Sequence, residues 1–443
     1  MDASLPGFTV DIDHNPYLPA GGRHVSAVVT VTADAPQDTP PQDTPPRQPG
    51  AGRAEIIIVD RSGSMALPGD KIAAARAATA AAVDVIRDGT WFAIISGARS
   101  ARPVYPAKGM AVADERTRQA AKDAVLRLQA RGGTAMSHWL RLAHELFQSC
   151  PATLRHAILL TDGMNGDWPG RLASAIELCE GTFRCDCRGV GTDWQVSELR
   201  KISTALLGTV DIVPEPAGLA ADFQEMMRGA MSKQLPDVLL RVWTPQQATV
   251  RFVKQVAPAI DDLTGRRVPS GAQAGDYPTG AWAPGESRDY HVGIQVGAGN
   301  VGQEMLAARV SLLATSPDRE QALGQGLVRA TWTEDEALSA RINQQVAHYT
   351  GQAELAEAIQ EGLEASKRGD AETATARLGR AVALAHRAGN EETARLLSRV
   401  VDVVDEATGT VRLKKTVDAA DEMALDSRST KTVRTRQDRN PGR

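Results

Sequence analysis

The sequence is poor in aromatic residues and in cysteine, and it lacks a long hydrophobic run. Aromatic residues make up 4% of its 443 residues, so Ala, Val, Leu and Ile must fill most of any core. Four cysteines are too few for a disulfide scaffold. No stretch reaches the roughly 18 apolar residues of a membrane span, and the first residues lack the basic and apolar regions of a secretory signal. We therefore expect a cytoplasmic protein with reduced thiols.

Positive charge is not in excess either. The 50 Lys and Arg residues face 54 Asp and Glu residues, which gives a net charge of -4. This balance argues against specific or general nucleic-acid binding, which needs a basic surface. The 42% of hydrophobic residues excludes wholesale disorder, and the length predicts roughly two to four domains.

The chain changes character several times along its length. In residues 54–233, apolar strand-like runs alternate with helical ones, a pattern typical of a mostly parallel, Rossmann-like, doubly wound α/β sheet. The strand-like N-terminal residues need a sheet to join, and the strands after 234 provide one. We therefore expect an antiparallel β-sandwich with the α/β domain inserted into it. The predicted segments are N-terminal sandwich strands (1–34), a Pro-rich linker (35–53), the α/β domain (54–233), the β-sandwich (234–333), a helical domain (334–410) and a basic Ser/Thr-rich tail (411–443).

The C-terminal helical domain is predicted to be a small bundle. Its helices should end near Gly351, Gly369 and Gly389, because glycine is a common helix stop. The last predicted helix covers 391–405, and the tail beyond about residue 425 is predicted to be disordered.

Oxygen-bearing side chains follow two strands of the predicted α/β sheet. Asp60, Ser62 and Ser64 form an Asp-x-Ser-x-Ser loop after the strand at 54–60, and Asp162 follows the strand at 156–161. Thr134 lies on a Gly-rich loop before a helix. Because ligands bind at the carboxyl ends of such strands, these loops should converge there. All five are hard oxygen donors, which suit Mg²⁺, Mn²⁺ or Ca²⁺. The alternative for Ser64 is that it caps the next helix.

This arrangement resembles the von Willebrand factor type A domain and its metal-ion-dependent adhesion site. The matching sequence segments are IIIVDRSGSM, RGGTAM and HAILLTDG, followed by GVGTDW and SELRKI at 189–202. The resemblance covers about residues 54–233 and implies a metal site at the five positions named above. It further implies that hydroxyls contact the metal directly, that at least one Asp acts through water, and that a carboxylate of a partner protein completes the coordination.

The resemblance also suggests which residues surround the site. The predicted partner-binding rim consists of Arg61, Met65, Met164 and Trp168. An exposed Trp168 would suit a partner contact. The alternative is that its ring packs under its own loop.

An enzymatic function has little support in the sequence. Neither a Gly-x-x-x-x-Gly-Lys phosphate loop nor a Gly-x-Ser-x-Gly elbow is present. His138 lies near the site, but a surface position on a helix is the simpler expectation. Cys179, Cys185 and Cys187 have unusual spacing for zinc and favour buried thiols. We expect a protein that is not an enzyme, with an Mg²⁺-dependent hydrolase as an unlikely alternative.

The C-terminal tail carries threonines among basic residues. Thr430, Thr432 and Thr435 are candidate sites for a Ser/Thr kinase, and a phosphothreonine could dock to a phosphopeptide-binding protein such as a forkhead-associated domain. The alternative is a solvated basic tail.

Together these features predict a metal-dependent scaffold or adaptor in intracellular signalling or stress response. The Ala-, Arg- and Gly-rich composition suggests an actinobacterial source. Two other functions stay open: an adaptor of an AAA+ ATPase of the MoxR or chelatase type, and a secreted adhesin, which the missing signal disfavours.

Overall fold

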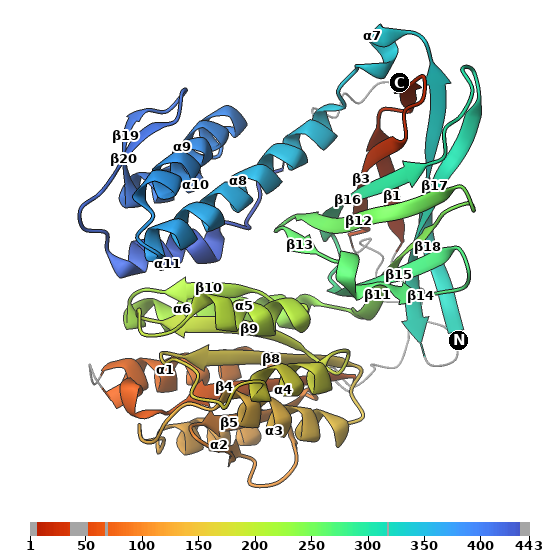
Figure 1. Ribbon diagram of the computed structural model, residues 1–443. Coiled ribbons are helices and arrows are strands. Elements are labelled where there is room, and N and C mark those ends of the chain that lie inside the picture. Colours follow the sequence, from red (N-terminus) through yellow and green to blue (C-terminus); the bar gives the residue numbers. More distant parts are fainter. Residues whose placement is uncertain (1–6, 36–51, 67–69, 317–318, 435–443) are drawn as a thin grey trace. The chain divides into compact units, whose positions relative to one another are not determined.

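The computed structural model describes residues 7–35, 52–66, 70–316 and 319–434 (Figure 1). The chain forms two compact units. One unit combines Met1–Gln37 with Asp237–Arg443, and the other is Asp38–Pro236. The second unit is therefore inserted in the sequence of the first, which confirms the predicted insertion.

The inserted unit is built on one mixed sheet with the strand order β10-β9-β8-β4-β5-β6, and β7 also pairs with β5. Parallel pairing joins β4 (Arg53–Asp60), β5 (Trp91–Gly97), β8 (Leu154–Thr161), β9 (Arg184–Val190) and β10 (Val210–Val213). The short β6 (Ala101–Tyr105) and β7 (Ala111–Val112) run antiparallel to β5. The sequence pattern predicts the parallel core, whereas β6 and β7, with five and two residues, are too short to stand out.

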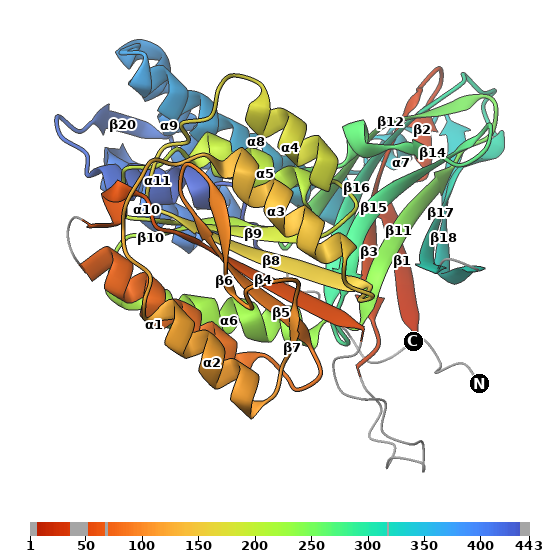
Figure 2. The same cartoon turned by 90° about the horizontal axis from the view of Figure 1, so that it is seen from below.

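Helices cover both faces of this sheet (Figure 2). One face carries α1 (Asp70–Val85), α2 (Glu115–Val125) and α6 (Leu219–Ser232), and the other carries α3 (Met136–Gln148), α4 (Arg171–Cys179) and α5 (Val196–Ala205). Short 3-10 turns, η1 (Gly63–Ala66) and η2 (Pro216–Gly218), precede α1 and α6. Because β4 is covered on both sides, its residues from Ala54 to Asp60 are all buried.

The strand register places the ends of β4 and β8 side by side. Val59 of β4 pairs with Leu160 of β8, and Asp60 pairs with Gly97 of β5. Asp60 and the residue after Thr161 therefore leave the sheet at the same edge. This edge is where ligands bind in open parallel sheets.

The first unit contains two sheets of mainly antiparallel strands. Their orders are β1-β3-β16-β12-β13 and β14-β15-β11-β17-β18-β2. The strands are β1 (Phe8–His14), β2 (Tyr17–Pro19), β3 (His24–Ala33), β11 (Leu235–Trp243), β12 (Ala248–Ala257), β13 (Asp261–Asp262), β14 (Val268–Pro269), β15 (Ala274–Trp282), β16 (Ser287–Val296), β17 (Glu304–Ser316) and β18 (Arg319–Thr333), with a 3-10 turn η3 (Thr264–Arg266). The sequence pattern misses β15, in which Gly275, Pro278 and Gly280 interrupt the apolar residues.

Helices follow the sandwich in the order α7 (Glu336–Ser339), α8 (Gln344–Lys367), α9 (Ala371–Ala388) and α10 (Glu391–Val400). A hairpin of β19 (Val401–Asp405) and β20 (Thr410–Leu413) then leads to α11 (Ala419–Arg428). Gly369 and Gly389 end helices with φ of 77° and 62°, as predicted. The prediction of a stop at Gly351 is wrong, because α8 continues through it. The predicted helix at 391–405 is wrong after Val400, because the valine-rich segment that follows forms the strand β19 (Val401–Asp405).

The start of the predicted tail is structured. The expected boundary at 411 falls inside β20, and residues 419–428 form α11. Beyond that helix, the chain runs along the sandwich: Thr430 O accepts a hydrogen bond from Ile260 N at 2.8 Å, and Thr432 Oγ1 donates to Val256 O at 2.6 Å. Thr435 lies outside the described residues. Within the described parts of the chain, no helix has the length and hydropathy of a membrane span.

Candidate metal centre

Four of the five predicted side chains meet directly at the carboxyl edge of β4 and β8. Asp60 ends β4, and Ser62 and Ser64 follow it in the loop and in η1. Ser64 Oγ donates a hydrogen bond to Asp162 Oδ1 at 2.6 Å and lies 2.9 Å from Ser62 Oγ. Ser64 does not cap α1, which begins at Asp70, so its hydroxyl belongs to the site.

Gly163 marks the point on which the hydroxyls converge. A Cβ at this glycine would lie 3.1 Å from Ser64 Oγ, 3.1 Å from Thr134 Oγ1 and 3.7 Å from Ser62 Oγ. The fifth predicted side chain, Thr134, therefore joins the other four. A space bordered by three hydroxyls and two buried carboxylates has the donor chemistry that Mg²⁺, Mn²⁺ and Ca²⁺ prefer. The residues present thus fit a divalent cation.

Asp60 is fully buried beneath this space. Its carboxylate accepts hydrogen bonds from Ser62 N at 2.6 Å and from Thr161 Oγ1 at 2.5 Å. Burial raises the pKa of Asp60 to about 6, and the two hydrogen bonds offset part of that rise. The fixed donors orient the carboxylate, so the site is largely preorganised.

A second group of contacts holds the loops together. Gly63 N donates to Gly132 O at 2.8 Å, which ties the serine loop to the threonine loop. Asp167 accepts hydrogen bonds from both the backbone N and the hydroxyl of Ser137, at 2.8 and 2.6 Å. Asn165 Oδ1 accepts one from Met136 N at 3.2 Å. The loop after β8 therefore caps the first turn of α3, directly behind Thr134.

Lys71 is a site residue that sequence reasoning misses. Its Nζ lies 3.0 Å from Asp162 Oδ2 and 3.2 Å from Asp193 Oδ2, and the residue is 5% exposed. Burial disfavours the charged ammonium, but the two carboxylates more than compensate and raise the pKa of Lys71. A lysine in the first turn of a helix usually lies on the surface, so nothing local in the sequence signals this contact.

Three of the four predicted rim residues are accessible, and the prediction is wrong for the fourth, Met65. Met164 and Trp168 are 61% and 75% exposed, and Arg61 is half-buried. Trp168 therefore does not pack under its loop. Met65 is fully buried in the core between the sheet and α1, so it cannot contact a partner. Met65 lies within the 3-10 turn η1 and is the residue of that turn that points inward.

The other candidate residues lie apart from this centre or bury their reactive groups. His138 is exposed on α3. Cys179, Cys185 and Cys187 are buried free thiols, and the sulfurs of the latter two lie 4.0 Å apart on β9. In the parts of the chain that the structure describes, no group of three or more His, Cys, Asp or Glu side chains is placed to hold a metal.

A separate buried charge cluster lies at the opposite end of the same strands. His156 of β8 is within 2.7 Å of Glu55 Oε2 through Nδ1 and within 3.0 Å of Asp186 Oδ2 through Nε2. Burial disfavours the imidazolium, but the two carboxylates more than offset this and raise the pKa of His156 to about 10. Burial also opposes ionisation of Asp186, yet contacts with His156 and Thr209 hold its pKa far below the usual range.

Comparison with known proteins identifies the family. Residues 54–212 match the model of the von Willebrand factor type A domain, and residues 383–429 match that of a von Willebrand factor type A C-terminal domain. A solved structure of von Willebrand factor type A from Catenulispora acidiphila is 50% identical, covers 98% of this chain and 99% of its own, and superposes with a TM-score of 0.91. The chain belongs to the von Willebrand factor type A family.

More distant structures share the fold of this von Willebrand factor type A (VWA) protein. The ArnB paralog VWA2 from Sulfolobus acidocaldarius is 14% identical, with 96% of this chain and 98% of that chain covered and a TM-score of 0.56. The human COPII-coat protein Sec24c is 9% identical, with 86% and 58% covered and a TM-score of 0.55. No curated protein matches the chain. The match to an actinobacterial protein agrees with the source suggested by composition.

Proposed function

We propose that this VWA protein binds a partner protein through a divalent cation, in the first place Mg²⁺, with Mn²⁺ or Ca²⁺ as the other candidates. Asp60, Ser62, Ser64, Thr134 and Asp162 would hold the ion. The observation that carries the proposal is the convergence of three hydroxyls on the space beside Gly163, above two buried carboxylates.

The chemistry of the donors explains why such a site would recognise a partner. Hydroxyl ligands are neutral, so a bound divalent ion keeps enough positive charge to attract a carboxylate from another protein. The chain's own residues prepare that position. Thr161 and Ser62 N fix Asp60, while Ser64 and Lys71 fix Asp162. Met164 and Trp168 offer exposed apolar surface from the loop that follows Asp162.

We infer that the site binds and does not catalyse. Catalysis of hydrolysis would need a nucleophile or a general base within hydrogen-bond reach of the substrate. The five side chains include no histidine, cysteine or lysine, and both carboxylates already accept hydrogen bonds from fixed donors. A scaffold role in intracellular signalling is the context that we favour.

The contacts of the tail limit how a kinase could modify its threonines. The hydroxyl of Thr432 donates to Val256 O, and the backbone of Thr430 pairs with Ile260. A kinase would therefore have to detach this segment from the sandwich before it could modify Thr430 or Thr432. Modification of Thr435 stays a prediction.

Direct metal titration followed by affinity capture from the native host tests the proposal. The full-length chain should bind Mg²⁺ in calorimetry, and Ser62→Ala/Ser64→Ala should bind it at least tenfold more weakly, because two hydroxyl ligands are removed. The matched control is Ser100→Ala/Ser174→Ala, which changes two exposed serines of the same unit.

The capture experiment compares the same variants in Mg²⁺ and in EDTA. A partner that is lost both with EDTA and with the double variant, and retained by the control, supports the proposal. Its identity then separates a signalling protein from an AAA+ ATPase. A partner that binds equally under all conditions contradicts metal-dependent recognition.

A further inference from the structure

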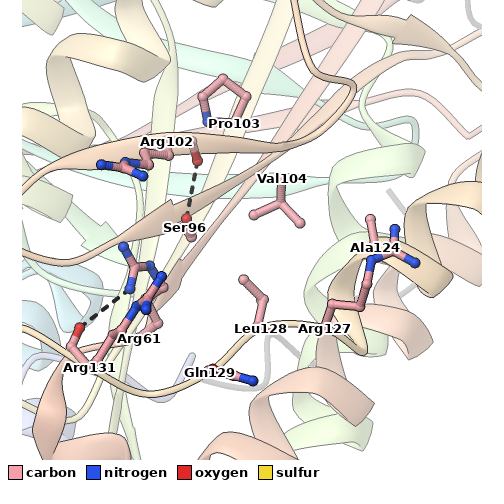
Figure 3. Close-up of a pocket in the computed structure, with 10 residues that line it drawn as sticks. All are labelled: Arg61, Ser96, Arg102, Pro103, Val104, Ala124, Arg127, Leu128, Gln129 and Arg131. Carbon is pink, nitrogen blue, oxygen red and sulfur yellow. Dashed lines mark hydrogen bonds between the residues drawn. The ribbon is translucent and has the colours of Figure 1, made fainter.

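A cavity of about 250 Å³ beside the metal centre is widely open to solvent and is lined by four arginines, of which Arg102, Arg127 and Arg131 are exposed. Arg61 comes from the loop after β4, Arg102 from β6, and Arg127 and Arg131 from the segment between α2 and α3 (Figure 3). Arg61 lies between the predicted metal ligands Asp60 and Ser62, so the cavity and the metal centre share one loop.

These positive charges have no acidic counterpart. No Asp or Glu lines the cavity, and none of the four guanidinium groups forms an ion pair with any residue that the structure describes. Arg61 instead donates from Nη1 to Arg131 O at 3.4 Å, and Arg131 N donates to Arg61 O at 2.6 Å. Like charges gathered in this way repel one another, and an anion between them would remove that repulsion.

The wall of the cavity between the arginines combines apolar carbon with the polar side chains of Ser96 and Gln129. Val104 and Leu128 lie between Arg127 and the group formed by Arg61, Arg102 and Arg131 (Figure 3). A ligand that fits must therefore carry concentrated negative charge next to aliphatic carbon. Because a phosphoryl group presents three acceptor oxygens to planar guanidinium groups, it can engage several arginines, whereas a carboxylate offers two oxygens and one charge.

We propose that this cavity, termed the arginine pocket and defined by Arg61, Arg102, Arg127 and Arg131, binds the phosphoryl group of a phosphorylated threonine or serine in a partner segment. The aliphatic carbons of that residue would pack against Val104 and Leu128. A pocket rather than a basic stripe favours a single modified side chain over a nucleic-acid backbone, which needs phosphate contacts along its length. Only the identity of the partner rests on the proposed function, because the pocket itself uses no metal ligand side chain.

Peptide binding in EDTA tests the pocket separately from the metal centre. The probes are inorganic phosphate and a short flexible peptide in three forms, with phosphothreonine, glutamate or threonine at its centre. The full-length chain should bind the phosphothreonine form at least tenfold more tightly than the glutamate form, with the threonine form weaker still. Binding should weaken with added salt, because the attraction is electrostatic.

Substitutions then assign the binding to the arginines. Arg102→Gln/Arg131→Gln should bind the phosphothreonine peptide at least tenfold more weakly. Arg102→Lys/Arg131→Lys keeps the charge but loses the planar fork, so an intermediate loss is expected. The control Arg116→Gln/Arg228→Gln removes the same charge from exposed positions on α2 and α6 and should change the affinity less than twofold. Retained Mg²⁺ binding and an unchanged melting temperature show that a variant is folded.

Several outcomes would overturn the assignment. Equal affinity of the wild type and Arg102→Gln/Arg131→Gln would show that the peptide binds elsewhere. Equal affinity for the phosphothreonine and glutamate forms would exclude phosphoryl recognition, and inorganic phosphate binding as tightly as the peptide would exclude a protein ligand. The variant Ser62→Ala/Ser64→Ala should keep its peptide affinity in EDTA. A wild type that binds the phosphothreonine peptide but not Mg²⁺ would count against the proposed function alone, and a wild type that binds Mg²⁺ but not the peptide would count against the arginine pocket alone.

Discussion

Glu55 and Asp60 lie near opposite ends of the same buried strand, β4, yet their surroundings differ in kind. At the first end, Glu55 faces His156, which in turn faces Asp186, and Asp186 also accepts hydrogen bonds from the backbone and hydroxyl of Thr209. At the second end, the carboxylates of Asp60 and Asp162 face hydroxyl groups and the single ammonium of Lys71.

The difference separates a closed charge cluster from the centre that we propose as a binding site. Around His156, opposite charges contact one another directly, at 2.7 and 3.0 Å. Around Gly163, hydroxyl oxygens border a space that a single methyl group would fill. A buried acid on a strand therefore does not by itself indicate function.

Breaking the closed cluster should have the largest effect. His156→Leu leaves Glu55 and Asp186 buried without a cation, which should lower the free energy of unfolding by about 3 kcal/mol. Hydrogen exchange of the β4 and β8 amides reports on this unit of the chain. His138→Leu, at an exposed position, is the matched control and should change stability by less than about 0.5 kcal/mol. Similar effects of the two substitutions would show that the cluster is not stabilising.

Removing the ammonium group of Lys71 should lower stability but strengthen metal binding. Lys71→Met leaves Asp162 without its ion pair, so we expect the metal-free protein to lose about 2 kcal/mol. Its Mg²⁺ affinity should rise about tenfold, because Asp162 no longer shares its charge with an ammonium. Thermal unfolding with and without Mg²⁺, combined with calorimetry, measures both.

The control for this prediction is Lys122→Met, which breaks the exposed pair with Asp84. An exposed pair contributes less than about 1 kcal/mol, and Mg²⁺ binding should not change. An unchanged or weaker Mg²⁺ affinity in Lys71→Met would contradict competition between the lysine and the metal.

Alkaline pH should reduce the difference in the free energy of unfolding between the wild type and His156→Leu. The pKa of His156 is about 10 in the folded chain against 6.5 for the ordinary side chain, so the folded state holds a proton that the unfolded state releases. The contribution is complete below about pH 6.5 and disappears as the pH rises through 10, with a slope of at most about 1.4 kcal/mol per pH unit. Denaturation of both proteins between pH 7 and 10 measures it. A stability difference that is constant over this range would mean that His156 is neutral at pH 7.

Filling the open space should have the smallest effect on the free energy. Gly163→Ala places a methyl group 3.1 Å from the hydroxyls of Ser64 and Thr134, so Mg²⁺ affinity should fall several-fold, by about 1 kcal/mol. Gly229→Ala on α6 adds a methyl group that meets nothing within 4 Å and should leave the Mg²⁺ affinity unchanged. Calorimetry on both variants checks the result. Equal Mg²⁺ affinities of the two variants would show that the ion does not bind beside Gly163.

The sequence predicts those parts of the site that depend on local spacing. Asp60, Ser62 and Ser64 are fixed by one loop, and Asp162 by the end of an apolar strand. The structure adds Lys71, Asn165 and Asp167, whose partners described above lie 29 to 122 residues away in the chain. Polar side chains of this kind look like ordinary surface residues until the fold brings their partners close.

The same limit explains the errors in the fold. Gly389 ends α9 because it adopts a left-handed conformation, whereas Gly351 keeps a helical one inside α8, and composition cannot tell the two apart. Met65 follows two site serines in sequence, but the 3-10 turn directs it inward. Apolar strands such as β4 are predictable because burial on both faces demands a continuous hydrophobic run.

The insertion also sets an order of events during synthesis on the ribosome. β3 pairs with β16, and about 250 residues separate Ala33 from Ser287. At roughly 5–20 residues per second, the hairpin of β1 and β3 waits about ten to fifty seconds for its neighbour, while the whole inserted unit emerges and folds. During that time its apolar face and the edge of β3 that later pairs with β16 are exposed. Exposed strand edges promote pairing between nascent chains. Asp11 and Asp13 on β1 add negative charge to the waiting hairpin, and mutual repulsion between such hairpins opposes that pairing.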